Sequence, residues 1–173
     1  MFDARTLRVR AGLALLVLGT SVGCDQVTKR IATATLMGQR VKSYAGDLVR
    51  LEYARNRGAF LSLGANLPDS VRYWLFTVGV GLFLLYLLYV TLTQPRFTTA
   101  QRCALLLMVG GGVSNAWDRF AAGLVTDFMN LGIGSLRTGI FNVADLAIVG
   151  GVAIMALAGR AKSPASHSAN MRG

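Results

Sequence analysis

Residues on which most hydrolases and metalloproteins depend are scarce in this sequence. Among its 173 residues are one histidine, His167, and two cysteines, Cys24 and Cys103. His167 lies in a polar tail, and the cysteines lie in separate apolar runs without metal-ligand spacing. These absences exclude histidine-based catalysis and a zinc site built from His and Cys. The eight acidic residues are also too few to favour a hard-cation site, which needs several oxygen ligands. We therefore expect no metal and no cofactor.

Charge is scarce as well, since only 15% of the residues are charged whereas 53% are hydrophobic. A soluble domain of this length could not bury so much apolar surface, so the composition favours a membrane protein. The formal net charge of +10 would suggest nucleic acid if the protein were soluble. However, the basic residues lie mostly in tails and connections, and no nucleic-acid-binding motif is present. We expect membrane lipid, and not nucleic acid, to be the partner of this charge.

Four apolar runs predict an all-α membrane protein, a bundle of four transmembrane helices. The spans are expected at about 7–24, 73–92, 104–119 and 140–159. Only the second and fourth runs reach the roughly 20 residues that a spanning helix needs. Four runs in so short a chain are nevertheless best explained by four spans. Residues 1–160 would form a single integral-membrane domain, and the polar residues 161–173 a disordered cytoplasmic tail.

The basic residues predict the orientation of these spans. They are dense before the first run, between the second and third runs, and after the fourth: Arg5, Arg8, Arg10, Arg96, Arg102, Arg160, Lys162 and Arg172. Short cytoplasmic segments of membrane proteins are enriched in Lys and Arg, so we expect both termini in the cytoplasm. In this topology four acidic residues from separate segments, Asp25, Asp118, Asp127 and Asp145, all come to the outer face.

The region 39–63 differs in kind from the apolar runs. Val49, Leu51 and Tyr53 alternate with more polar residues, and this period of two is typical of a half-exposed strand. A partner strand is expected near Val41 and Tyr44, with a turn at residues 45–47. We therefore predict a small extracytoplasmic β-sheet between the first and second helices.

Asp127 and Asp145 are the candidate catalytic residues. Asp145 near the start of a helix could be explained by the helix dipole alone, but a second carboxylate from the other side of the same excursion could not. Two such groups in a low-dielectric pocket cannot both ionise easily and would share one proton. The ionised member would take a proton from water while the neutral member donates to the scissile carbonyl. Asn142 lies three residues before Asp145 and could hydrogen-bond one of the acids.

The remaining polar motifs have simpler interpretations. Asp25 and Lys29 are four residues apart and predict an interfacial charge pair on one helical face; alternatively they orient a substrate or a lipid headgroup. Asn56 and Gly58 lie in a stretch that is typical of an ordinary turn. Asn115, Asp118 and Arg119 share one end of the third run, where a charge pair between Asp118 and Arg119 would anchor the helix end. Glycines 110–112 in the same run indicate close helix approach.

Three other interpretations compete with the aspartate pair. Ser114 or Ser62 could act with Lys29 as a Ser–Lys protease, but neither serine has a supporting motif. The first 24 residues superficially resemble the signal peptide of a lipoprotein, with Ser21 where a Leu is expected; three further spans argue against this. The third rival is a non-catalytic four-helix membrane carrier or chaperone, whose intramembrane acids bind a cation or a polar ligand.

Five sequence blocks in order resemble the lipoprotein signal peptidase (signal peptidase II) family: DQVTK from 25, NRGAF from 56, GGVSNAWDR from 111, GLVTDF from 123 and FNVAD from 141. The resemblance implies a bacterial inner-membrane aspartyl endopeptidase with four transmembrane helices and a small outer sheet. Such an enzyme removes the signal peptide of diacylglyceryl-modified prolipoproteins, on the amino side of the lipidated cysteine. We take it to act as a monomer near the outer face of the membrane.

By the same resemblance Asp127 and Asp145 are the catalytic pair. Site support or substrate contact is assigned to eight further residues: Asp25, Lys29, Asn56, Gly58, Asn115, Asp118, Arg119 and Asn142. Two departures from the family pattern are present. Ser114 stands where the family usually has Gly, and the NRGAF block lacks one of two usual alanines. Both could alter packing around the site, and neither removes a catalytic group.

Overall fold

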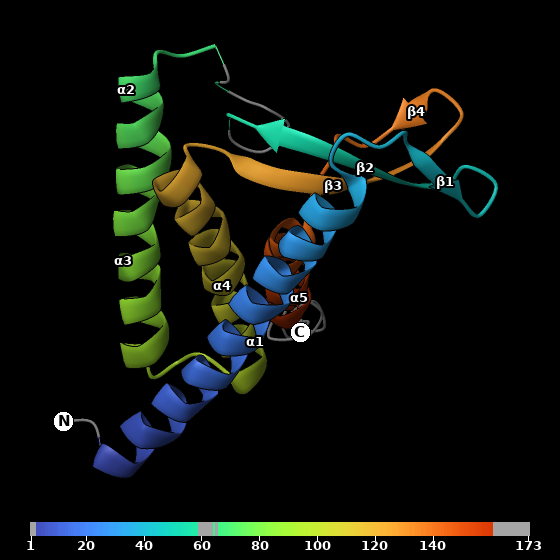
Figure 1. Ribbon diagram of the computed structural model, residues 1–173. Coiled ribbons are helices and arrows are strands. Elements are labelled where there is room, and N and C mark those ends of the chain that lie inside the picture. Colours follow the sequence, from blue (N-terminus) through green and yellow to red (C-terminus); the bar gives the residue numbers. More distant parts are fainter. Residues whose placement is uncertain (1–2, 59–63, 65, 161–173) are drawn as a thin grey trace, which may run out of the picture.

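The computed structural model describes residues 3–58, 64 and 66–160 (Figure 1). The predicted disordered tail, 161–173, lies outside the described residues, as do Ser62 and His167. The described chain is mostly helical, with a small antiparallel sheet at one end of the helices.

The first helix, α1 (Ala4–Leu36), is much longer than the first apolar run. Next in the chain, α2 (Asp69–Tyr73), a π-helical segment (Trp74–Gly79) and α3 (Val80–Thr93) follow one another directly. The last two helices are α4 (Thr99–Ala122) and α5 (Val143–Arg160). Helix α4 packs against α1, α3 and α5, so it is the central helix of the bundle.

Glycines let α4 approach its neighbours closely. A Cβ atom on Gly111 would lie 2.3 Å from the carbonyl oxygen of Ala144 in α5. A Cβ on Gly110 would lie 2.8 Å from that of Ser21 in α1. Both distances are shorter than any real contact, so a larger residue would push the helices apart. The expectation of close helix approach at these glycines is confirmed.

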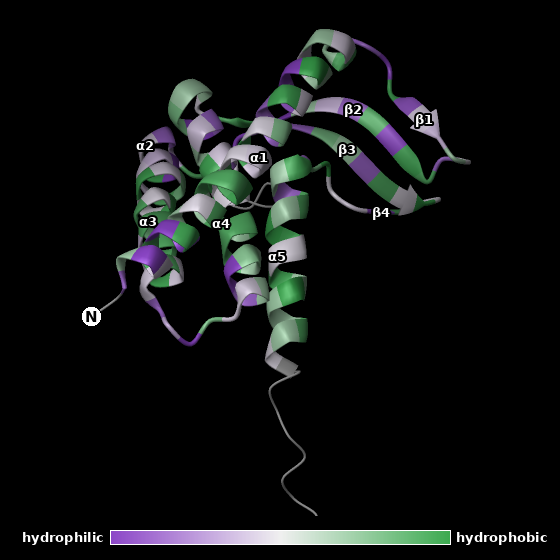
Figure 2. Cartoon of the chain, turned by 90° about the horizontal axis from the view of Figure 1, so that it is seen from below, coloured by the Kyte–Doolittle hydropathy of each residue, from purple (hydrophilic) through white to green (hydrophobic). Residues whose placement is uncertain are grey.

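Among the described residues, two helical stretches are long and apolar enough to cross a membrane, Ala4–Leu36 and Asp69–Thr93, and Val143–Gly159 is a shorter apolar helix. Helix α4 is more polar because much of it faces other helices, with Arg102, Ser114 and Asn115 buried. The apolar exposed side chains of α3 and α5 are typical of lipid-facing surfaces. In Figure 2, α5 is mostly green or pale (hydrophobic or neutral), whereas purple (hydrophilic) bands interrupt β2 and β3.

The sheet has four antiparallel strands in the order β1-β2-β3-β4. Strands β1 (Lys42–Tyr44) and β2 (Val49–Asn56) form the hairpin that the sequence predicts, with Tyr44 opposite Val49. The turn between them places Ala45 and Asp47 at positive φ. Strands β3 (Val125–Ile133) and β4 (Leu136–Arg137) come instead from the connection between α4 and α5.

The second half of the sheet was not predicted from the sequence, which indicated strands only within 39–63. The reason is visible in β3, where the consecutive residues Asp127 and Phe128 are both buried. A strand that is covered on both faces shows no alternation of apolar and polar residues. Phe128 packs with Ala32 and Leu36, and so fastens the sheet to the end of α1.

Candidate active site

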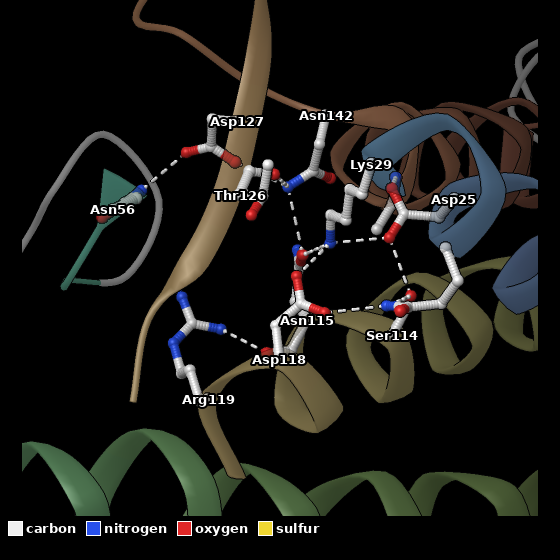
Figure 3. Close-up of polar contacts among 12 residues, drawn as sticks. Asp25, Lys29, Asn56, Ser114, Asn115, Asp118, Arg119, Thr126, Asp127 and Asn142 are labelled. Carbon is white, nitrogen blue, oxygen red and sulfur yellow. Dashed lines mark hydrogen bonds and ion pairs between the residues drawn. The ribbon is translucent and has the colours of Figure 1, made fainter. Parts of the chain in front are cut away.

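A buried lysine lies where α1 meets α4. The Nζ atom of Lys29 is 2.6 Å from Asp25 Oδ2 and 2.8 Å from Asp118 Oδ2. It also donates a hydrogen bond of 2.8 Å to Asn115 Oδ1. Lys29 is 4% exposed and Asp25 is fully buried. The predicted charge pair between Asp25 and Lys29 is therefore present, but it is buried and not interfacial: α1 continues past the pair, and the face that carries it packs on α4 (Figure 3).

Asp25 connects three helices. Its Oδ1 accepts a hydrogen bond of 2.8 Å from the backbone N–H of Ala144, in the first turn of α5. Its Oδ2 accepts one of 2.7 Å from the Oγ of Ser114 in α4. The N-terminus of a helix is a favourable place for a carboxylate, because its first N–H groups lack partners within the helix. Asp25 of α1 thus acts as a distant cap for α5.

Gln26 was not among the predicted site residues, although it lies next to Asp25. Its Nε2 donates to Ser114 Oγ at 2.9 Å and to Asp118 Oδ1 at 2.8 Å. In place of the expected pair with Arg119, Asp118 pairs with Lys29. Only the adjacency of Gln26 to Asp25 in the sequence could have suggested its role.

Asn142 connects the two candidate catalytic aspartates. Its side-chain amide donates to Asp127 Oδ1 at 2.6 Å, and its backbone N–H donates to Asp145 Oδ2 at 3.1 Å. Asn115 adds a donor to Asp145 Oδ1 at 3.0 Å and accepts from Asn142 at 3.1 Å. Asp127 is in β3 and Asp145 in the first turn of α5, so the sheet and the bundle meet at this point.

The turn after β2 completes the site. Asn56 Nδ2 donates to Asp127 Oδ2 at 3.0 Å, while its Oδ1 accepts from the backbone N–H of Gly58 at 2.9 Å. Arg119 at the end of α4 donates to the carbonyl oxygen of Gly58 at 2.7 Å. Pairing of β2 with β3 puts Ala54 opposite Asp127, and this register delivers Asn56 to the carboxylate. The turn is therefore part of the site and not an isolated loop.

These contacts join every predicted site residue into one network. Starting at Asp25, it passes through Lys29, Asn115 and Asn142 to Asp127, and then to the turn at Asn56 and Gly58. The remaining members, Asp118, Arg119 and Asp145, each bond directly to this chain of contacts.

Burial raises the pKa of Asp127 to about 6, with the negative charge of Asp145 acting in the same direction. The hydrogen bonds from Asn56 and Asn142 favour the ionised carboxylate and oppose this rise. Asp127 is 2% exposed, so little water reaches it. A carboxyl group with this pKa can hold a proton near neutral pH, as a general acid must.

The contacts of Ser114 argue against a Ser–Lys dyad. Its hydroxyl donates to Asp25 and accepts from Gln26. The Nζ atom of Lys29 contacts oxygens of Asp25, Asp118 and Asn115. Neither member has the partner that this mechanism needs.

A mostly apolar cavity of about 320 Å³ reaches the network from between the helices. Asn115, Arg119 and Asp145 line its polar part. Its apolar lining comes from the π-helical segment, α3, α4 and α5: Phe76, Val80, Gly112, Ile148 and Val149. The cavity could therefore hold an apolar chain with a polar end group beside Asp145.

Apolar helices, a small sheet at one end of them and two linked aspartates at their junction define a membrane protein with a carboxylate site. The chain belongs to the signal peptidase II family, since the family model described as Signal peptidase (SPase) II matches residues 17–159. Proteins of this family are proteases that remove signal peptides from prolipoproteins.

Two relatives show the extent of the match. The chain is 35% identical to a lipoprotein signal peptidase of Methylocella silvestris over 144 residues, which cover 83% of this chain and 82% of the relative. It is 31% identical to a lipoprotein signal peptidase of Syntrophotalea carbinolica over 146 residues, covering 84% and 89%. The fold is also that of a bacterial membrane enzyme solved by the in meso method at 2.3 Å resolution, with a TM-score of 0.74, 24% identity, and coverage of 93% and 95%.

Proposed function

We propose that the chain is an aspartyl endopeptidase that cuts diacylglyceryl-modified bacterial prolipoproteins on the amino side of the lipidated cysteine. Asp127 and Asp145 are the catalytic residues in this proposal. The observation that carries it is the position of Asn142, which donates to both carboxylates from one residue. An asparagine shared in this way holds the two acids at one site, although they come from a strand and a helix.

The chemistry needs one proton between the two acids. In this proposal Asp127, whose pKa burial raises to about 6, holds the proton. Ionised Asp145 takes a proton from a water molecule, which attacks the scissile carbonyl while neutral Asp127 donates to the carbonyl oxygen. Collapse of the tetrahedral intermediate breaks the peptide bond: the leaving amine receives its proton from Asp145, and a hydroxyl of the intermediate returns a proton to Asp127. No step requires a metal or a cofactor.

The proposal includes an arrangement of the chain in the membrane. In the proposal four helices span the inner membrane, the sheet covers the outer end, and both termini are cytoplasmic. The substrate enters sideways from the bilayer. A single copy of the chain binds it. One of its acyl chains occupies the cavity that ends at Asp145, and its peptide lies between the sheet and the helices.

Cleavage of a diacylglyceryl prolipoprotein by the purified full chain tests the proposal. Asp127→Asn and Asp145→Asn should each lower kcat by about a thousandfold or more, because either change removes a member of the acid–base pair. The matched control is Asp47→Asn, in the same sheet but outside the network, which should retain cleavage. An inhibitor of aspartyl peptidases should block the parent chain.

The carrier or chaperone interpretation predicts a different set of results. No peptide bond would be cut by the parent chain, and Glu would replace either aspartate without loss of function. Near-normal cleavage by Asp127→Asn or by Asp145→Asn would show that the catalytic assignment is wrong.

A further inference from the structure

Aromatic side chains mark one level of the helix bundle. Tyr73 and Trp74, where α2 passes into the π-helical segment, contact each other edge to face and are exposed. Trp117 and Phe120, in the last turns of α4, form a second exposed aromatic pair. Tyr and Trp concentrate at the boundary between the hydrocarbon core and water. These pairs therefore place the headgroup layer of the outer leaflet at the sheet end of α4.

A basic cavity of about 370 Å³ lies at the same level. Arg57, Arg72 and Arg119 line it, and Asp69 is the one acidic residue of its lining. Asp69 pairs with Arg72, and Arg119 also donates to the carbonyl of Gly58. The lining carries three positive charges against one negative charge. Guanidinium groups match the geometry of phosphate oxygens, so this cavity suits a phosphate group.

An apolar groove continues from the basic cavity. It has a volume of about 420 Å³, and Thr77 lines both spaces. The groove lies between α3 and α4, which pack against each other (Figure 1). Its apolar lining includes Leu82, Leu85, Leu88, Val109, Val113 and Trp117. A phosphate site that opens into a groove of this kind has the dimensions and polarity of one lipid molecule.

We propose that this composite site binds an anionic phospholipid, with its phosphate among the three arginines and an acyl chain in the groove between α3 and α4. Charge complementarity selects the anionic headgroup, and the groove selects a lipid over free phosphate. The basic cavity shares Phe76 and Arg119 with the cavity that we assign to the substrate, whereas the apolar groove shares no lining residue with it. The inference goes beyond the peptidase function and depends only on the chain being in a membrane.

Tryptophan fluorescence can report this binding directly. The chain has two tryptophans, so Trp74→Phe leaves Trp117, in the groove, as the only reporter. The full chain with this change is placed in phosphatidylcholine bilayers that contain increasing amounts of brominated phosphatidylglycerol or brominated phosphatidylcholine. Bromine quenches the indole on contact. We expect half-maximal quenching at an about fivefold lower mole fraction of the anionic lipid, a preference typical of one basic side chain near a membrane surface.

A charge-matched pair of variants identifies the site. In the Trp74→Phe background, Arg57→Gln with Arg72→Gln should reduce the preference to less than about twofold. The control, Arg30→Gln with Arg40→Gln, removes two exposed charges outside the cavity and should keep the preference. The thermal midpoint of each variant verifies that it is folded.

Three results would overturn the proposal. One is equal quenching by the two lipids, and another is a preference that survives loss of Arg57 and Arg72. The third is an equal loss in the control, which would reflect surface charge in general. Inorganic phosphate that changes Trp117 fluorescence in neutral bilayers, without a lipid preference, would assign the cavity to free phosphate and also reject the proposal. Because cleavage is not the readout, failure here leaves the peptidase assignment untouched.

Discussion

Two ion-pair networks hold distant segments of this chain together, and they differ in their exposure to water. The inner network joins Lys29 of α1 to Asp25 and to Asp118 of α4. The outer network joins Asp47, in the turn between β1 and β2, to Arg50 and to Arg137 of β4. Lys29 and Asp25 have side chains that are 5% and 0% exposed, whereas those of Arg50 and Asp47 are 35% and 38% exposed.

The outer network fastens one hairpin of the sheet to the other. Asp47 accepts from the hydroxyl of Ser43 at 2.6 Å and from Arg50 Nε at 2.7 Å. Arg137 donates to the carbonyl oxygen of Asp47 at 2.8 Å and also to Asn130. The hydrogen bond from Arg50 holds the pKa of Asp47 well below its usual range. Water nevertheless reaches these groups and can replace a lost partner, so each ion pair contributes little.

Loss of one partner of an ion pair has different consequences for stability in the inner and the outer network. A buried ion pair contributes little net stability over an apolar core, but removal of one partner leaves an uncompensated buried charge. In the inner network the position of α5 therefore depends on a lysine of α1, because this lysine pairs with the aspartate that caps α5. In the outer network the same kind of change is absorbed by solvent.

The sharpest way to test the comparison is to remove the buried cation. Lys29→Met leaves Asp25 and Asp118 without their counter-charge, and we expect a loss of about 3–5 kcal/mol in stability. Thermal unfolding of the purified chain in detergent measures the change. Arg50→Met, which removes a cation of the outer network, is the matched comparison and should shift the midpoint only slightly. Equal shifts in the two variants would show that burial does not distinguish the networks.

The same substitution at the two ends of the sheet should have opposite effects. The native pKa of Asp127, about 6, lies above the unfolded value of 3.8, so ionisation destabilises the fold as pH rises through this window. The stability of Asp127→Asn relative to the parent chain should therefore rise by up to about 3 kcal/mol between pH 4 and pH 7. The native pKa of Asp47 is lowered, so its contribution is present at pH 7 and is lost on acidification.

Thermal midpoints of Asp127→Asn and Asp47→Asn at these two pH values provide the measurement. Relative to the parent chain, the midpoint of the first variant should rise from pH 4 to pH 7, and that of the second should fall slightly. A loss of stability in Asp127→Asn that grows with pH would contradict a raised pKa at this position.

The smallest expected effect is that of removing Asn56, which donates a hydrogen bond to Asp127. If Asp127 supplies the shared proton, kcat/KM should fall on the alkaline side with an apparent pKa near 6, the value given by its burial. Asn56 donates to the carboxylate and favours its ionised form. Asn56→Ala should therefore move the alkaline limb to higher pH. Arg55→Ala, at the exposed neighbouring position, should leave it in place. A limb that moves to lower pH would rule out this role of Asn56.

Patterns within single segments were predicted correctly. The alternation at Val49, Leu51 and Tyr53 identified β2, and the partner strand near Tyr44 pairs with it as expected. The three consecutive glycines in α4 indicated close packing, which Gly111 makes with α5. These features depend on the period of a helix or strand and on the size of a side chain, both of which can be read locally.

Features that depend on partners far along the chain were missed. The polar residues Asp25 and Lys29 suggested the end of a span, but α1 continues to Leu36 because α4 supplies Ser114, Asn115 and Asp118 as partners. Strand β3 gave no alternation because its consecutive residues Asp127 and Phe128, which point to opposite faces of the sheet, are both buried. The role of Gln26 depends on a contact with Asp118, 92 residues away.

The sequence alone determined that this chain has long apolar helices, a hairpin near residue 50 and acidic residues concentrated where the apolar runs end. Hydropathy, period and residue type suffice for these, because each reflects the interaction of a short segment with water or lipid. Only the tertiary structure decided that Asn142 lies between Asp127 and Asp145, and that the lysine of α1 is buried among the acids. Those positions follow from the pairing of β2 with β3 and the close approach of α4 to α1 and α5, which no single segment contains.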